Sequence, residues 1–342
     1  MRWTGLVFPL LLILLLSACS APQAGDQPVT AVSAPPATAA QAAIPQAAAS
    51  QGASSDPPQA VPAEASPTLA AAAGPSTPIA TPTTAGAAAS APTPAPDAWQ
   101  SLPVIPQVSK ASLQIYQRGL ELGNNPRAFS KVGDCGSTPA WFLGDFDRGP
   151  KYYQLGPYQN LEGVIQQFAG SFNRNSLAAG RGFNTSSVFT VLWADRALCN
   201  SGETPLACEY RLNRPAFAFI MLGTNDVYHK DMFEAQMRKI IEFSIQNGVL
   251  PILSTKADNM EGDNSINRTI ARLAAEYDLP LWNFWLAARS LPDYGLQEDK
   301  AHLTWGPNRF DDPQALTRGW TVRNLTALQA LDAAWRDVTN TS

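Results

Sequence analysis

The chain has 342 residues, with 24 basic and 28 acidic side chains and a formal net charge of −4 at pH 7. This near balance, without any run of basic residues, gives no electrostatic case for nucleic-acid binding. Even when the compositionally unusual N-terminal part is set aside, the remainder is long enough for one α/β domain with a sizeable core.

The N-terminus has the layout of a secretory signal, with Arg2, an apolar run over residues 6–16 and small residues before Cys19. The run is too short to span a bilayer in the mature protein, although a lone transmembrane anchor is the alternative. Its end resembles a bacterial lipobox, which implies cleavage before Cys19 and a lipid on its sulfur. We therefore expect residues 1–19 to be a lipoprotein signal peptide and the exported chain to be lipid-anchored to the outer face of the cell membrane.

Residues 20–98 consist almost entirely of Ala, Pro, Thr, Ser, Gln and Gly, without Lys, Arg or aromatic residues. Such a segment cannot bury enough apolar surface to offset the entropy of ordering it. The composition predicts a disordered spacer that separates a folded domain, residues 99–342, from the membrane.

The four cysteines are expected to differ in chemistry. With Cys19 committed to lipid, Cys135, Cys199 and Cys208 remain in an oxidising compartment. Cys199 and Cys208 flank a polar loop and most simply close it as a disulfide. Cys135 is then the odd cysteine.

The folded part alternates between strand-like and helix-like patterns. Alternation of this kind favours a parallel sheet covered by helices on both faces, with functional residues at the carboxyl ends of the strands. Strands are predicted over residues 128–132, 188–193, 216–222, 249–254 and 281–285, and helices over 161–168, 231–247, 267–277 and 319–338.

The segment 131–137 looks like a turn that presents a hydrolase nucleophile, with a thiol in place of a hydroxyl. It follows the first predicted strand and precedes Thr138-Pro139, a good N-cap followed by proline at the first helical position. Cys135 is therefore expected in a strand-to-helix turn.

Three further segments follow predicted strands or lie near the C-terminus. Asn225 can donate its amide to an oxyanion, a role worth about 3 kcal/mol, or it forms an Asx turn that caps the next helix. Glycine at position 182 allows a backbone N–H to approach a reacting oxygen. Asp299, three residues before His302, can orient the ring as in a hydrolase triad, or both are surface residues. The other histidine, His229, is interpreted as a solvated turn residue.

In chain order these segments resemble the four sequence blocks of the SGNH hydrolase family, also called GDSL-type esterases or lipases. The third and last blocks are specific matches, the second is loose, and the first has a cysteine where the family has serine. From first to last, the matching residues are Gly133-Asp134-Cys135, Gly182, Gly223-Thr224-Asn225-Asp226 and Asp299-x-x-His302.

The resemblance implies a flavodoxin-like three-layer α/β sandwich with a central parallel sheet, and an acyl hydrolase that uses neither a metal nor a cofactor. Carried over residue by residue, it implies Cys135 as nucleophile, His302 as base and Asp299 as the orienting acid. It also implies an oxyanion hole made by the N–H of Gly182, the side chain of Asn225 and the N–H of Cys135.

Substrates of the family include lipids, small esters, acetylated sugars and peptidoglycan. The predicted spacer and lipid anchor favour an ester-bearing carbohydrate of the envelope or medium, or another small ester. Trp141 and Trp305 offer faces for sugar stacking, although buried core aromatics are the more ordinary interpretation of both. Asp145 and Asp147 either bind substrate or cap a turn, and the segment 254–259 follows another strand end beside the site.

The thiol at position 135 leaves three interpretations open. Cys135 is a working thiolate, activated by a helix N-terminus and a nearby histidine. Alternatively Ser137 is the nucleophile, displaced by several ångströms. In the third interpretation the protein is a non-catalytic glycan-binding or scaffold lipoprotein, with Cys135 bonded to Cys199 or Cys208.

Overall fold

The computed structural model describes residues 97–340. The predicted signal peptide, the predicted lipid on Cys19 and all but the end of the predicted spacer lie outside the described residues, and the domain boundaries stay a prediction. Within residues 97–340, no helix combines the length and the apolar character needed to cross a bilayer.

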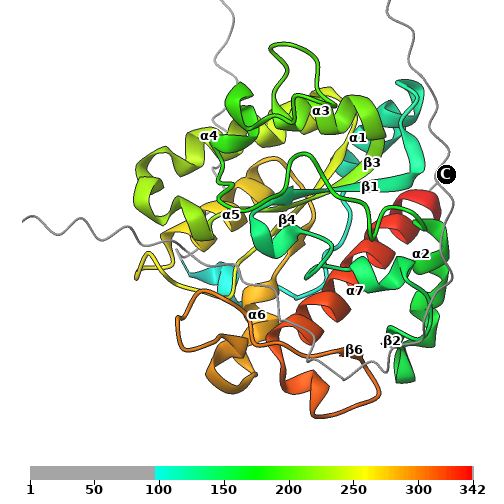
Figure 1. The fold of residues 1–342 in the computed structure, drawn as a ribbon, viewed down its shortest axis with the longest axis vertical. Helices are drawn as coiled ribbons and strands as arrows, with labels where there is room; N and C mark the ends of the chain where they lie inside the picture. The colour runs from blue at the N-terminus through cyan, green and yellow to red at the C-terminus, as the bar shows by residue number, and fades with distance from the viewer. Residues whose placement is uncertain (1–96, 341–342) are drawn as a thin grey trace, which may run out of the picture. The chain divides into compact units, whose positions relative to one another are not determined.

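A four-stranded parallel sheet organises the described part (Figure 1). Its strand order is β1-β3-β4-β5, and all three neighbouring pairs run parallel. The strands are β1 (Asn125–Gly133), β3 (Pro215–Met221), β4 (Leu250–Ser254) and β5 (Leu281–Trp282). A separate pair, β2 (Tyr153–Gln154) and β6 (Asn308–Arg309), is also parallel.

A short loop segment takes the edge position beside the end of β1. The N–H of Gly133 donates to the carbonyl of Ala178 at 3.1 Å, and the N–H of Gly180 donates to the carbonyl of Gly133 at 3.1 Å. If the segment around Ala179 is counted as an edge strand, the sheet has five members. Numbered along the chain without the separate β2–β6 pair, they lie in the order 2-1-3-4-5, which is the flavodoxin-like order. The predicted α/β class with a central parallel sheet is therefore confirmed.

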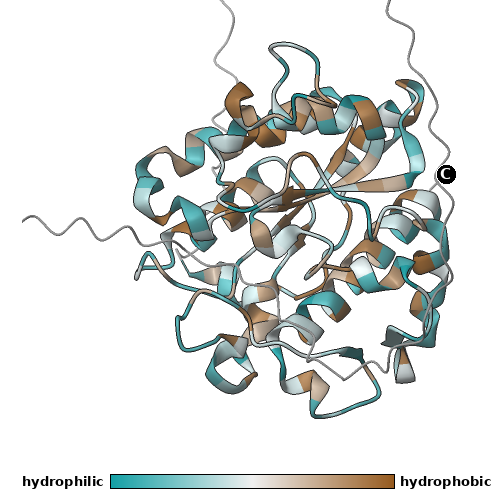
Figure 2. Ribbon diagram, in the orientation of Figure 1, coloured by the Kyte–Doolittle hydropathy of each residue, from teal (hydrophilic) through white to brown (hydrophobic). Residues whose placement is uncertain are grey.

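The strands form because their apolar runs are buried on both faces. Every residue of β3 and β4 is buried, as are the last six of β1, which matches the near-continuous apolar runs typical of parallel sheets. Figure 2 shows mostly hydrophobic strands at the centre, surrounded by helices in which hydrophilic and hydrophobic residues alternate. The sheet thus gives the strand ends a rigid base.

Helices cover both faces of the sheet (Figure 1). On one side α3 and α4 pack through stacked Tyr210 and Phe243, while on the other α2 and α7 meet where Phe168 contacts Trp335. The helices are α1 (Lys110–Glu121), α2 (Glu162–Gln167), α3 (Pro205–Asn213), α4 (Lys230–Gln246), α5 (Ser265–Glu276), α6 (Phe284–Arg289) and α7 (Gly319–Asn340).

One predicted strand is wrong. Residues 188–193 form two short 3-10 turns, Ser187–Phe189 and Val191–Trp193, and Leu192 is 81% exposed. The edge beside β1 is already taken by the segment around Ala179, so this apolar run has no strand to pair with. A short apolar run by itself does not distinguish a strand from a loop that exposes it.

Two other predictions need smaller corrections. The strand predicted over 281–285 ends at Trp282, and α6 begins at Phe284. Thr138-Pro139 does not begin a regular helix, because irregular turns and the 3-10 helix Gly144–Asp147 follow instead. The remaining predicted strands and helices are confirmed to within a few residues.

Candidate functional site

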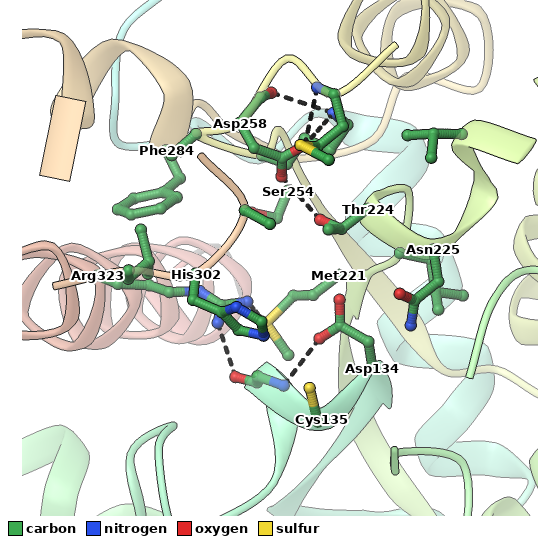
Figure 3. A pocket seen from close by; sticks show the side chains of 18 of the residues that line it. Asp134, Cys135, Met221, Thr224, Asn225, Ser254, Asp258, Phe284, His302 and Arg323 are labelled. Atoms are coloured by element: carbon green, nitrogen blue, oxygen red, sulfur yellow. Dashed lines mark hydrogen bonds and ion pairs between the residues drawn. The ribbon is translucent and has the colours of Figure 1, made fainter. Parts of the chain in front are cut away.

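One cavity of about 470 Å³ lies at the carboxyl ends of the parallel strands. Cys135, Gly182, Asn225 and His302 all line it, and they come from four segments far apart in the sequence (Figure 3). The fold therefore brings together the four segments that the sequence singled out.

The turn after β1 places Cys135 at this cavity. Its first residue, Asp134, caps the 3-10 helix Cys135–Ser137 by accepting the N–H of Gly136 at 2.9 Å. Position 133 requires glycine, since a Cβ there would overlap Ser137 Oγ and lie 2.8 Å from the carbonyl oxygen of Met221. Burial raises the pKa of Asp134, and the positive charge of Arg323 opposes that rise.

Ser137 occupies a different environment in the same turn. Its side chain is fully buried beneath Gly133, and its Oγ makes no hydrogen bond within residues 97–340. It does not line the cavity, so a substrate there cannot reach it. The interpretation of Ser137 as a displaced nucleophile is therefore wrong for this structure.

The predicted disulfide between Cys199 and Cys208 is present, with an S–S distance of 2.10 Å. The alternative that tied Cys135 to Cys199 or Cys208 is therefore wrong. A sulfur in a disulfide is not a nucleophile, so any attack by Cys135 requires its reduced form.

Asp299 and His302 form the predicted acid–histidine pair. Nδ1 of His302 lies 2.6 Å from Oδ2 of Asp299, while Oδ1 accepts the N–H groups of Ala301 and His302, each at 3.0 Å. Partial burial alone would raise the pKa of Asp299, but these hydrogen bonds lower it. Because Asp299 occupies Nδ1, only Nε2 can act as a base.

Figure 3 shows the imidazole of His302 and the side chains of Asp134 and Cys135 pointing into the same part of the cavity. His302 enters from the loop that precedes α7, whereas the other two follow β1. In contrast, His229 is exposed at the end of the 3-10 helix Thr224–His229, as the sequence predicted.

Gly182 and Asn225 lie on two loops that are hydrogen-bonded to each other. Gly182 has a φ of +79°, in the left-handed region that favours glycine, and a Cβ there would lie 3.1 Å from the Trp193 ring. The amide Nδ2 of Asn225 donates to the carbonyl of Phe183 at 2.9 Å. This bond fixes the amide and leaves its second N–H for an oxyanion. The N-cap of α4, the helix that Asn225 was alternatively expected to cap, is His229, and no side chain caps it, so that alternative is wrong.

Asp226 adds a second connection between the loop of Gly182 and the loop of Asn225. The sequence had not predicted a role for this residue. It is buried and accepts both the N–H and the hydroxyl of Thr185, at 3.0 Å and 2.5 Å. Burial raises the pKa of Asp226, while the bonds from Thr185 oppose the rise. The only sequence feature that could have indicated this role is its position next to Asn225.

Lys256 belongs to a buried ion-pair group at the cavity. Its Nζ lies 2.6 Å from Asp258 Oδ1 and 2.6 Å from Glu261 Oε2. The other carboxylate oxygen of Asp258 accepts the hydroxyl of Thr224 at 2.8 Å. Since Thr224 precedes Asn225, this group ties the loop after β4 to the loop after β3. Of the predicted segment 254–259, all residues but Asn259 line the cavity.

Arg323 of α7 also lines the cavity, and no local pattern in the sequence pointed to it. Its guanidinium lies 4.9 Å from the Phe142 ring centroid and 5.2 Å from that of Trp320. It donates to the carbonyl of Gly136 at 2.7 Å, which holds the Cys135 turn against α7. Burial lowers the pKa of Arg323 to about 10, although nearby carboxylates oppose this.

Comparison with known proteins yields likeness to solved structures only. No family model matches the chain. A search of curated proteins also finds no match. Among solved structures, the chain is similar to a GDSL-like lipase from Bacteroides thetaiotaomicron, at 14% identity and a TM-score of 0.37, over 66% of this chain and 98% of that chain. The functional assignment therefore rests on the geometry of the site.

Proposed function

We propose that the chain is an acyl-ester hydrolase of the SGNH type, with reduced Cys135 as nucleophile, His302 as base and Asp299 as its orienting acid. The observation that supports this most directly is the cavity lined by Cys135, Gly182, Asn225 and His302, where Asp299 holds Nδ1 of His302 at 2.6 Å. A purely structural role does not require an acid–histidine pair at the mouth of a cavity.

In the proposed reaction Cys135 Sγ attacks the ester carbonyl carbon and its proton passes to His302 Nε2. The resulting oxyanion accepts hydrogen bonds from the N–H groups of Gly182 and Cys135 and from the Asn225 amide. Collapse of this intermediate expels the alcohol, which takes the proton from His302. Water, deprotonated by the same ring, then hydrolyses the thioester and restores the thiol.

The proposed substrate is an esterified, for example acetylated, polysaccharide of the cell envelope or the medium. Support comes from the N-terminal sequence, in which the predicted signal peptide, Cys19 and the spacer of residues 20–98 point to an exported, lipid-anchored protein. Balanced charge gives no reason to expect nucleic acid.

The test is turnover of p-nitrophenyl acetate with and without reductant. Turnover is expected in the presence of reductant, which keeps Cys135 as a thiol, and Cys135→Ala is expected to lower this turnover by about a thousandfold, because the nucleophile is lost. The matched control is the double variant Cys199→Ser/Cys208→Ser, which lacks the second disulfide and should respond to reductant as the parent does. Full turnover by Cys135→Ala would contradict the proposal.

A second candidate is a non-catalytic glycan-binding lipoprotein on the same fold. It is favoured by one observation, the 61% exposure of Trp305 three positions after His302, which leaves an indole face open to a sugar ring. This candidate predicts that no redox state hydrolyses p-nitrophenyl acetate, while binding of a glycan persists after Cys135→Ala.

A further inference from the structure

A second, smaller depression lies beside the main cavity. Its volume is about 30 Å³, enough for a hydroxyl group or a water molecule but not for a whole sugar ring. Three tryptophans, a carboxylate and two amides are among the residues that line it, namely Trp141, Trp305, Trp320, Asp145, Asn308 and Asn324.

The polar side of the depression is a rigid hydrogen-bonded chain. Asn324 Nδ2 donates to Asn308 Oδ1 at 3.0 Å, and Asn308 Nδ2 donates to Asp145 Oδ2 at 3.0 Å. Asn308 and Asn324 are almost completely buried, whereas the Asp145 side chain is 30% exposed and also pairs with Arg148. A carboxylate accepts about four hydrogen bonds, so Asp145 retains lone pairs for hydroxyl donors.

The apolar side combines a fixed indole with an exposed one. Trp141 stacks on Trp320, with ring centroids 5.4 Å apart and an interplanar angle of 24°. Trp305 is 61% exposed, so its interpretation as a buried core residue is wrong. Exposing a large aromatic side chain beside buried polar groups has no folding advantage, because burial of an indole is strongly favourable.

The depression adjoins the proposed reaction site. Trp320 lines both the small depression and the main cavity, and Trp305 follows His302 by only three positions. A ligand lying on Trp305 with one hydroxyl toward Asp145 would therefore extend toward the main cavity.

We propose that Trp305, with the Asp145–Asn308–Asn324 chain behind it, is a pyranose subsite that holds a sugar unit next to the esterified one. The inference rests on the proposed function, in which the reacting ester is carried by a glycan. The pyranose ring stacks on the indole through its C–H face, and one ring hydroxyl donates to Asp145. An acyl chain would gain nothing from this carboxylate, so the chemistry selects a saccharide.

The test measures binding separately from catalysis. The full chain carrying His302→Ala, which does not turn over substrate, is titrated with chitotetraose, xylotetraose and cellotetraose by calorimetry. Trp305→Ala in this background is expected to weaken binding of the preferred probe by about tenfold or more, and Trp305→Phe is expected to retain most of it. Leu192→Ala, which removes a side chain that is 81% exposed on another loop, controls for non-specific adsorption and should leave binding unchanged.

Catalysis supplies the second measurement. On acetylated xylan Trp305→Ala should raise KM by about tenfold with little change in kcat, and on p-nitrophenyl acetate it should match the parent. The subsite is overturned if Trp305→Ala binds like its parent, if Leu192→Ala weakens binding equally, or if none of the three probes binds at about 10 mM. If the protein hydrolyses esters but Trp305→Ala binds the probes as well as its parent, the subsite is refuted and the hydrolase is not. If Trp305→Ala weakens binding but the protein does not hydrolyse esters, the hydrolase is refuted and the subsite is not.

Discussion

The two halves of the candidate site are held in different ways. The strand half, consisting of Asp134, Cys135 and Asn225, directly follows β1 and β3, whose inner residues are completely buried. The loop half, consisting of Gly182 and the Asp299–His302 pair, lies on exposed loops held by individual hydrogen bonds. Changes in the strand half should therefore cost stability together with activity, whereas changes in the loop half should cost activity alone.

The largest effect is expected in the loop half, for Asp299→Asn. With its one oxygen held by the N–H groups of Ala301 and His302, the amide turns its NH2 toward Nδ1 and donates to it, so the ring loses the tautomer that makes Nε2 a base. Turnover of p-nitrophenyl acetate by the reduced protein should fall by about a thousandfold. Since the pair is 37% and 49% exposed, the free energy of unfolding should change by less than about 1 kcal/mol.

The control for this change is Asp293→Asn on the neighbouring loop. Asp293 is 75% exposed and lies 3.9 Å from Lys300, so its replacement should affect neither turnover nor stability. If Asp299→Asn retained its activity, the proposed role of the loop half would be refuted.

The next largest effect is expected in the strand half, where Gly133→Ala should lower both stability and turnover. The added methyl group would overlap Ser137 Oγ and press on the carbonyl oxygen of Met221 in the neighbouring strand. Overpacking at a buried site is expected to cost about 3 kcal/mol, measured by chemical denaturation, and to lower turnover as well.

Gly163→Ala is the matched control in α2. A Cβ there would lie 3.6 Å from Arg336 and meet no other group, so the change should be neutral or stabilise the protein by less than about 1 kcal/mol. Equal stability of both alanine variants would show that the Cys135 turn is not packed as described.

A smaller effect is expected where the two halves join, for Thr185→Val. This nearly isosteric change removes the hydroxyl that donates to Asp226 and keeps the backbone bond. It should cost about 1 kcal/mol of stability and lower turnover by about tenfold, because the Gly182 loop loses one tie to β3. Thr190→Val, which removes a hydroxyl from the same loop without touching Asp226, should leave turnover intact.

The last prediction concerns the pH dependence of stability rather than turnover, and it probes the core beneath the strand half. Burial lowers the pKa of Lys131 in β1 to about 7, with Arg174 adding to the effect. Above that pH the folded state holds the neutral amine, while the unfolded chain still binds a proton until its ordinary pKa of 10.5. The free energy of unfolding should therefore rise with pH from about 7 upward, by at most about 1.4 kcal/mol per pH unit.

Lys131→Met should flatten this rise between about pH 7 and pH 9, as measured by urea unfolding at several pH values. It also removes the hydrogen bond from Nζ to the carbonyl of Phe172, at 2.7 Å, so the variant is compared with itself across pH. An unchanged slope would show that Lys131 does not titrate in this range.

The sequence alone was sufficient where structure depends on local pattern. Apolar runs with turn formers at their ends predicted β1, β3 and β4, and helical periodicity predicted α4, α5 and α7. The disulfide and the hydrogen bond between Asp299 and His302 join residues that are close in the chain, so spacing was informative. These features give the parallel sheet and the order of the segments at its carboxyl edge.

Features that depend on distant contacts could not be predicted. Arg323 supports the Cys135 turn from α7, and Asp226 ties the Gly182 loop to the loop after β3. Ser137 is buried against Gly133 and does not line the cavity. The run over 188–193 is apolar like a strand, yet only the occupied edge beside β1 shows that it is a loop.

Local propensity and spacing therefore determined the elements and the candidate residues, because backbone hydrogen bonding and burial act over a few neighbouring positions. The tertiary structure decided which side chains share the cavity, which hydroxyl is buried away from it and which tryptophan is exposed. The physical reason is that burial and pairing depend on neighbours brought close only by the packing of the sheet and its helices.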